Sequence, residues 1–168
     1  MSRVLDLYRT STTLPLVGPL VGERLFSFAF SQVAPYFWSI RPRFTVIEPH
    51  HAEVVIPKRR AVKNHIGTVH AIALCNGLEA AMGVLAEATI PPSKRWIPKG
   101  MEVAYTAKAT TDITCHADTE AAQWSDDALP GTGGEVSVRV KGVRTDGTVV
   151  IEGVIRLWVT PKRPQGSR

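Results

Sequence analysis

The chain is short of cysteine, of charge blocks and of low-complexity segments. Only two of its 168 residues are cysteines, Cys75 and Cys115, and they lie far apart with no CxxC spacing. This excludes a disulfide framework and a zinc knuckle, and it favours a reducing, cytoplasmic location. Because no low-complexity tract and no long run of like charges is present, extended disorder is not expected.

The sequence also lacks a convincing membrane segment. The apolar and aromatic stretch 14–40 is interrupted by Glu23 and Arg24, and three prolines break it further. No compact apolar run directly follows a basic N-terminal region, as a signal peptide would require. We therefore expect no transmembrane segment and no signal peptide.

Length and charge narrow the class of protein. A chain of 168 residues can bury one core well and is too short for two, so one domain is expected. Twenty lysines and arginines against fifteen acidic residues give a formal charge of +5, which favours anionic partners such as phosphorylated cofactors, nucleic acid or an acidic membrane. Because no RNA-binding aromatic pattern, zinc spacing or recognition helix accompanies the charge, we do not expect nucleic-acid binding.

The first forty residues are predicted to form an N-terminal helical extension. One short helix is expected from Arg3 to about Tyr8 and a longer one from about Val21 to Ser39, ending before the Arg41-Pro42-Arg43 break. The longer helix is rich in phenylalanine, which predicts a hydrophobic flap packed on the main domain. The alternative is a helix in peripheral contact with a membrane surface, but basic residues are sparse there.

The centre of the chain predicts a strand followed by a long helix. Residues 44–57 alternate with period two, and Pro49-His50 is a suitable place for a hairpin turn. Residues 68–88 contain no proline and are apolar on nearly every side, which predicts a helix about 30 Å long. A helix that is apolar all round must be buried.

The remainder of the chain predicts the β-structure that would cover this helix. Strands are expected at 95–109, 112–124, 135–143 and 148–160, with an Asp146-Gly147 hairpin and a mobile loop at 126–134. The predicted class is α+β, a hotdog fold in which a curved antiparallel sheet wraps around a long central helix. We assign residues 41–162 to this domain and 163–168 to a disordered tail. A ferredoxin-like fold would need a second long helix between the later strands.

A polar cluster lies at the start of the predicted central helix: Asn64, His65, Gly67, Thr68 and His70. Thr68 is the expected N-cap, which would leave the first amides of the helix free. Free N–H groups at the positive end of a helix suit an oxyanion, such as the tetrahedral intermediate of thioester hydrolysis.

Glu79 is an unexpected carboxylate on a helix that should be buried. A desolvated carboxylate without a cationic partner has a raised pKa and can serve as a general base or nucleophile. The alternative is that Glu79 pairs with a basic residue of a second subunit. Because it lies two turns beyond Ala71, it could not reach the oxyanion site of its own subunit, so catalysis would need a homodimer or a dimer of dimers.

These residues resemble a known signature. Asn64-x-x-Gly67-x-x-His70-Ala71, with Glu79 nine positions after His70, is similar to the Asn-x-x-Gly-x-x-His-Gly-Gly…Asp/Glu pattern of phenylacetate-type hotdog thioesterases, and the wider chain resembles the DUF4442 branch. The resemblance implies an acyl-CoA thioesterase with no cofactor beyond the CoA of its substrate. It assigns Glu79 as base or nucleophile, the Ala71 N–H as donor to the thioester carbonyl, and Asn64 as the residue that positions substrate or water.

One departure from the signature leaves two other functions open. His-Gly-Gly is replaced by His70-Ala71-Ile72, and the bulky Ile72 would narrow the space for substrate. A non-catalytic binder of acyl-CoA or lipid is therefore an alternative, covered by the aromatic flap. A hotdog dehydratase or hydratase that pairs His70 with Glu79 across a dimer is another.

The basic residues and histidines complete the candidate site. Arg59, Arg60 and Lys63, joined by Lys94 and Arg95, could bind the phosphates of CoA, although a solvated basic loop is an equal reading. The five histidines include no HExxH motif and no partner at ligand spacing, so we do not expect a metal site.

Overall fold

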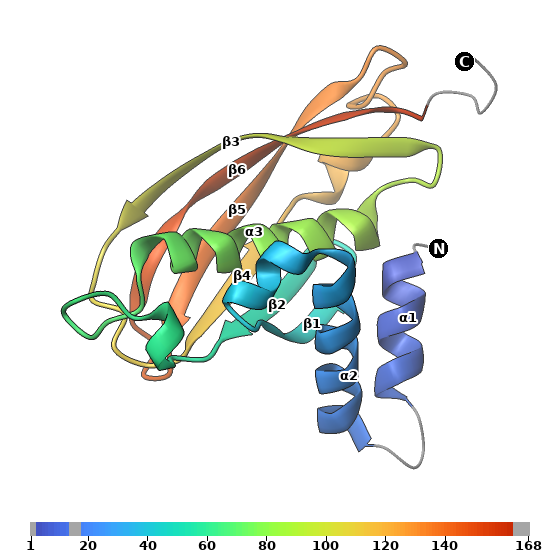
Figure 1. Cartoon of the computed structure of the whole chain (residues 1–168). Coiled ribbons are helices and arrows are strands. Elements are labelled where there is room, and N and C mark those ends of the chain that lie inside the picture. The colour runs from blue at the N-terminus through green and yellow to red at the C-terminus, as the bar shows by residue number, and fades with distance from the viewer. Residues whose placement is uncertain (1–2, 14–17, 163–168) are drawn as a thin grey trace.

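The chain forms a curved antiparallel sheet with a long helix lying across its concave side, and two further helices beside one edge (Figure 1). The structure is a computed structural model that describes residues 3–13 and 18–162, so the predicted tail 163–168 lies outside the described residues. Its elements are α1 (Arg3–Thr12), α2 (Gly18–Val33), η1 (Pro35–Ser39), β1 (Arg43–Glu48), β2 (His51–Ile56), η2 (Arg60–Val62), α3 (Ala71–Thr89), β3 (Lys94–Tyr105), β4 (Ile113–Asp118), η3 (Ala121–Trp124), β5 (Gly134–Arg144) and β6 (Val149–Pro161).

The sheet has the order β1-β2-β4-β5-β6-β3, and each neighbouring pair is antiparallel. The predicted hotdog fold is therefore confirmed. Both predicted hairpins are confirmed too: Glu48 pairs with His51 across Pro49-His50, and Asp146-Gly147 joins β5 to β6. Gly147 has a φ of 85°, a left-handed conformation that glycine adopts without strain.

Three predicted elements end earlier than the sequence pattern suggested, and one of them is the strand expected over 95–109, which ends as β3 at Tyr105. The helix from Val21 to Ser39 stops at Val33, because Pro35 cannot continue it, and the last residues form the separate 3-10 helix η1. The strand predicted over 112–124 ends at Asp118, and Trp124 lies in η3 instead. The Trp124 indole is buried there and donates to the Thr119 hydroxyl at 3.2 Å, a tertiary contact that the apolar pattern cannot reveal.

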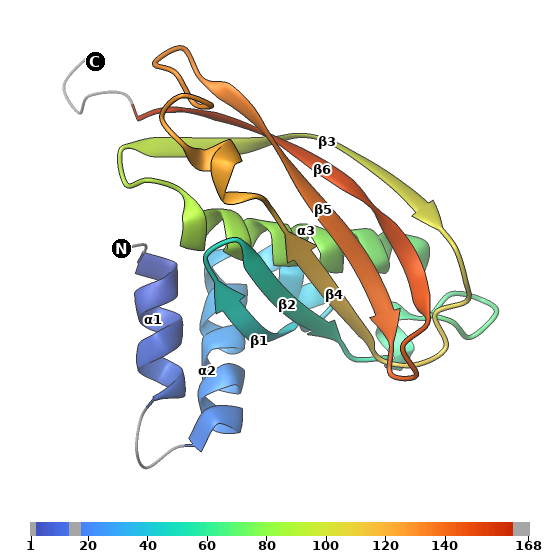
Figure 2. The same cartoon turned by 180° about the vertical axis from the view of Figure 1, so that it is seen from behind.

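The N-terminal helices pack against the first strand, as predicted for a flap. Phe26 and Phe30 of α2 contact Phe44 of β1 at ring-centroid distances of 5.5 and 4.7 Å. The Tyr8 hydroxyl of α1 donates to the Thr45 carbonyl at 2.6 Å. Figure 2 shows both helices on the β1 side of the sheet. They therefore extend the core at that edge.

The central helix α3 is buried on one side only. Leu78, Met82 and Leu85 are fully buried against the sheet. The expectation that α3 is buried all round is wrong for the single chain, because one stripe of the helix stays partly exposed: Ile72, Cys75, Glu79, Gly83 and Glu87. Their spacing of three or four residues places them on one face.

Among the described residues, α3 is the one helix long and apolar enough to cross a membrane. In this fold 56% of that segment is buried inside the protein. The core helix of a sheet-wrapped protein can have this length and apolar composition without any membrane, because its apolar surface faces the sheet.

Candidate functional site

The segment before α3 is a tight turn built around Asn64. The Asn64 side-chain oxygen accepts from the amides of Ile66 and Thr68 at 3.2 and 3.1 Å, and its Nδ2 donates to the Thr68 hydroxyl at 2.8 Å. Gly67 completes the turn with a φ of 81°, a conformation that side chains rarely adopt. Asn64 and Gly67 thus shape the loop that leads into the helix, and the Asn64 amide is engaged within that loop.

The N-cap of α3 is His70, so the prediction of Thr68 was wrong. The Thr68 hydroxyl is taken by Asn64, and the chain enters the helix two residues later. His70 Nδ1 accepts from the Ile72 amide at 3.1 Å. The amide of Ala71 has no acceptor among the described residues. The predicted oxyanion donor is therefore the first amide of the helix, and it is available.

A pocket of about 180 Å³ opens beside this helix terminus. It is bounded by α3, by the loop around η2 and by η1 of the N-terminal extension, so the flap supplies one of its walls. Its lining includes Tyr36, Ser39, His70, Ile72 and Asn76. Ile72 is 58% exposed at the rim, where the related signature has glycine. The pocket therefore joins the helix mouth to the N-terminal extension.

Asn76 is a site residue that the sequence analysis missed. It is only 5% exposed, and its Nδ2 donates to the Ser39 hydroxyl at 3.2 Å. Its Oδ1 is buried without a hydrogen-bond partner in the described structure. Buried polar atoms are almost always paired, so this oxygen suits a donor that enters the pocket. An asparagine inside an apolar helix was the available signal.

Glu79 lies on the open stripe of α3, away from the helix mouth. It lines a second pocket of about 310 Å³ with Pro98, Lys99 and Met101 of β3 and with Ile155 of β6. It is half-buried, and no salt bridge joins it to a basic residue in the described part of the chain. Glu79 follows Ala71 by eight positions, which corresponds to about 12 Å along the helix axis. One chain therefore does not bring Glu79 and Ala71 together.

Strand β3 runs along the open stripe of α3 (Figure 1). The Cys75 thiol lies 3.2 Å from the Tyr105 hydroxyl at one end, and the Trp96 indole donates to Glu87 at 2.9 Å at the other. The hydrogen bond to Cys75, helped by burial, raises the pKa of Tyr105 to about 12. Among the described residues β3 pairs with β6 alone, so within residues 3–13 and 18–162 no strand covers the other edge of this twelve-residue strand. Long free edges are natural places for association with another chain.

The five predicted CoA-binding residues do not form one group in a single chain. Arg59, Arg60 and Lys63 lie around η2 near the start of α3, whereas Lys94 and Arg95 begin β3 just beyond the end of α3. The length of the helix, about 28 Å, separates the two sets. Lys94 is moreover buried and donates to the Leu129 carbonyl at 2.7 Å, so it stabilises the 126–134 loop. The prediction that Lys94 and Arg95 join the first three is wrong for the single chain.

Arg59 is held in place rather than free in solvent. Its guanidinium donates to the Ser39 carbonyl of η1, and burial together with the nearby Arg41 lowers its pKa. Arg60 and Lys63 are exposed. Of these three predicted residues, Arg60 and Lys63 therefore stand at the surface near the helix mouth, and Arg59 connects the N-terminal extension to the loop before α3.

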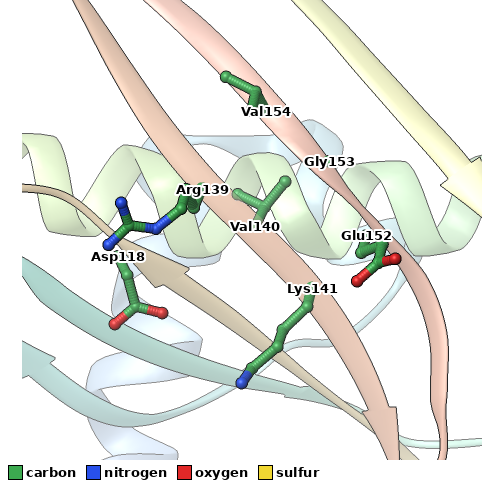
Figure 3. A pocket seen from close by; sticks show the side chains of 7 residues that line it. All are labelled: Asp118, Arg139, Val140, Lys141, Glu152, Gly153 and Val154. Atoms are coloured by element: carbon green, nitrogen blue, oxygen red, sulfur yellow. The ribbon is translucent and has the colours of Figure 1, made fainter.

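A third pocket, of about 370 Å³, lies on the outer face of the sheet, on the opposite side from α3 (Figure 3). Its charged lining residues are Asp118 of β4, Arg139 and Lys141 of β5, and Glu152 of β6. None of the residues predicted from the motif contributes to it. It is therefore distinct from the helix-mouth and Glu79 pockets.

Comparison with known proteins places the chain in a family. Residues 22–159 match the domain of unknown function DUF4442. A crystal structure from structural genomics is 40% identical over 95% of this chain and 99% of its own, with a TM-score of 0.77. No curated protein matches the sequence significantly.

Two more distant structures carry thioesterase names. One, from Pseudomonas aeruginosa, is a protein of unknown function named "Probable Thioesterase"; it is 21% identical over 83% of this chain and 94% of its own, with a TM-score of 0.72. The other is a thioesterase family protein from Silicibacter pomeroyi, 16% identical over 81% of this chain and 96% of its own, with a TM-score of 0.62. At these identities the likeness concerns the fold. The chain belongs to the DUF4442 family, and it shares the hotdog fold with these two proteins.

Proposed function

We propose that this protein is an acyl-CoA thioesterase that works as a homodimer, alone or as a dimer of dimers. The proposal rests on two groups of α3 considered together. The Ala71 amide at the start of the helix has no acceptor among the described residues, and the half-buried Glu79 on the open stripe forms no salt bridge with them. The thioesterase names of proteins with this fold support it.

The two groups would meet across a two-fold axis. If the open stripes of two α3 helices pack antiparallel about this axis, a residue before the axis in one protomer faces the residue equally far beyond the axis in its partner. An axis beside Cys75, midway between Ala71 and Glu79, sets the Ala71 amide of one protomer opposite Glu79 of its partner. The free edge of β3 supports the same pairing, because it runs along this stripe.

In the proposed reaction Glu79 takes a proton from water, and the water oxygen attacks the thioester carbonyl. The negative charge on the carbonyl oxygen is stabilised by the Ala71 N–H and the positive end of α3. The carbon–sulfur bond then breaks, the carboxylic acid forms, and the thiolate of CoA takes up a proton. Direct attack by Glu79 would instead pass through an acyl anhydride that water hydrolyses. Single turnover in heavy-oxygen water separates the two, since only direct attack leaves label in Glu79.

The helix-mouth pocket is suited to the pantetheine arm of CoA. Pantetheine carries amide N–H groups, and the unpartnered Oδ1 of Asn76 can accept from one of them. The exposed Arg60 and Lys63 stand beside this pocket and can attract the CoA phosphates. In this proposal Asn64 and Gly67 act by holding the turn that presents the Ala71 amide.

The first experiment compares acyl-CoA hydrolysis by the wild type, Glu79→Gln and Glu87→Gln, measured as release of free CoA over a panel of acyl chains. Glu87 is the matched control, because it is a half-buried glutamate on the same stripe of α3. We expect Glu79→Gln to lose about 100-fold or more of kcat, as for a lost general base, and Glu87→Gln to stay within a few-fold. Equal rates for the wild type and Glu79→Gln would overturn the assignment.

A second experiment removes the amide donor without removing the helix. Proline is well tolerated at the first position of a helix, and His70 already has the extended conformation that precedes proline, with φ −65° and ψ 141°. Ala71→Pro should lower kcat by about 100-fold or more. When Ala71→Pro and Glu79→Gln chains are mixed and form dimers at random, the mixture should recover about a quarter of wild-type activity. Half of the dimers then contain one chain of each kind, and each such dimer has one intact site out of two. No recovery would exclude the shared site.

A specific observation favours a second function. Ile72 is 58% exposed at the rim of the helix-mouth pocket, where the related signature has glycine. A side chain there can hold an acyl-CoA without letting water approach its carbonyl. Tight binding of acyl-CoA with no release of free CoA would identify a binding protein, and Ile72→Gly should then create measurable turnover. Hydration of crotonyl-CoA would identify a hydratase instead.

A further inference from the structure

Four ionisable side chains form a compact group on the outer face of the sheet. His51 and Glu53 alternate along β2, and His116 and Asp118 alternate along β4. In the register of the two strands His51 stands opposite Asp118 and Glu53 opposite His116. The residues between them face the core, so this group lies on the side of the sheet away from α3. It takes no part in the proposed hydrolysis.

The atoms of this group are spaced like the ligands of one metal ion. Glu53 Oε1 lies 3.2 Å from His116 Nδ1 and 3.5 Å from His51 Nε2, and each of the three residues offers one possible ligand atom within 4.8 Å of the other two. Ligand atoms at about 2.1 Å from a tetrahedral zinc ion are about 3.4 Å apart. We propose that His51, Glu53 and His116 bind one divalent transition-metal ion of the zinc class.

Asp118 gives the site the outer hydrogen bond that metal-binding histidines usually have. Its Oδ1 lies 2.8 Å from His51 Nδ1. Because an ionised carboxylate only accepts, the proton of a neutral His51 stays on Nδ1, and the lone pair of Nε2 is directed toward Glu53. A carboxylate that fixes the tautomer and orientation of a ligating imidazole in this way typically contributes tenfold to 100-fold to metal affinity.

The charges around the group set its dependence on pH. Burial lowers the pKa of His51, but the hydrogen bond and charge of Asp118, with Glu53, outweigh it and raise the pKa overall. Burial lowers the pKa of His116, and Lys141 of β5, which stands opposite it, acts in the same direction. Histidine ligates a metal ion only as neutral imidazole, so metal binding strengthens as pH rises.

The site is accessible and has room for a further ligand. The side chains of His51 and Glu53 are 34% and 29% exposed, and that of His116 is 20% exposed. Three protein ligands leave one tetrahedral position for water or for an exogenous group, the arrangement of an open zinc site. Asp118 and Lys141 also line the 370 Å³ pocket of the outer face (Figure 3). An anionic group held by Lys141 in that pocket could occupy the open position.

The test is titration of the tag-free protein with Zn²⁺ at pH 7.5, by calorimetry and by the thermal unfolding midpoint. We expect one ion per chain, a Tm that rises with Zn²⁺ because the ion binds the folded state, and weaker binding at pH 6. Co²⁺ should give an absorption spectrum typical of nitrogen and oxygen ligands.

Variants locate the ion. His51→Asn and His116→Asn should each lose at least tenfold in Zn²⁺ affinity, and Asp118→Asn about tenfold. His65→Asn, which removes an exposed histidine from the loop before α3, is the matched control and should bind like the wild type. Binding that persists unchanged in both His51→Asn and His116→Asn, or no binding at millimolar Zn²⁺ while the apo proteins remain folded, would overturn the proposal.

Discussion

Gly77 lies where α3 packs closely against the sheet, and Gly77→Ala tests that contact. A methyl group there would overlap Ile56 Cδ1 and would lie 2.7 Å from Ile56 Cγ1 and 2.8 Å from Cys115 Sγ. Ile56 and Cys115 are both fully buried, so neither can move into solvent. The helix approaches this closely because the glycine has no side chain.

The magnitude follows from two opposing effects. Replacing glycine by alanine within a helix stabilises it by about 1 kcal/mol, whereas overpacking a well-packed core costs about 1–3 kcal/mol. With three contacts under 3 Å, we expect an overpacking cost of about 2–3 kcal/mol, in the upper half of this range, so Gly77→Ala should lower the free energy of unfolding by about 1–2 kcal/mol. Gly83→Ala is the control within one chain, because among the described residues a methyl there meets Trp96 Cη2 at 3.7 Å and should stabilise by up to about 1 kcal/mol. Since Gly83 lies on the open stripe, both variants are compared at a protein concentration at which the chains are monomeric.

The assay is urea unfolding followed by tryptophan fluorescence at fixed protein concentration, extended to a double-mutant cycle with Ile56→Val. That change removes Cδ1 and alone should cost about 1 kcal/mol. In the double variant part of the overlap disappears, so the combined loss should be smaller than the two single losses together by about 1 kcal/mol. The reasoning is refuted if the two losses add within about 0.5 kcal/mol or if Gly77→Ala stabilises as much as Gly83→Ala.

Three further predictions concern other parts of the fold. In thermal unfolding, Gly153→Ala should lower Tm far more than Gly142→Ala. A methyl group at Gly153 would overlap the Glu102 carbonyl oxygen of β3, whereas one at Gly142 meets side-chain methyl groups. Similar shifts in Tm for the two variants would contradict this. His51→Asn, measured in EDTA, should destabilise the protein more at pH 6 than at pH 9. The folded state raises the pKa of His51, so protonated His51 contributes to stability. This contribution is fully present below the ordinary pKa of 6.5 and is lost as pH rises through the raised pKa. Urea unfolding at both pH values measures the difference, and an equal loss would disprove the His51–Asp118 contribution. Burial raises the pKa of the Cys115 thiol, so Cys115 should react with a thiol reagent only after denaturant is added. Rapid labelling of Cys115 in the folded Cys75→Ser variant would contradict this and would show that the core opens.

The elements with a strong periodic pattern were predictable from sequence. The central helix was expected over 68–88 and is found at 71–89. The prediction succeeded because a proline-free apolar stretch of that length in a globular domain forms a helix rather than a strand. The strands expected at 135–143 and 148–160 differ from β5 and β6 by one residue at each end. Their alternation and the Asp146-Gly147 turn fix both face and register.

Features that depend on tertiary contacts were not predictable. The N-cap could not be assigned because Thr68 is the better capping residue by type, and only the Asn64 hydrogen bond shows that it is occupied elsewhere. The open stripe of α3 was hidden because an apolar helix pattern does not say which side its own sheet covers. The grouping of His51 with His116 depends on the β2–β4 register, since the two lie far apart in sequence.

The strand order has a consequence for how the chain is made. β6 lies between β5 and β3, yet it is the last of the strands to leave the ribosome, so β3 has no partner until then. The apolar face of α3 is synthesised more than seventy residues before β6 ends, an interval on the order of ten seconds during translation. Throughout that interval α3 of the nascent chain is incompletely covered. Chaperones that bind apolar helices should therefore contact residues 71–89 before the domain closes.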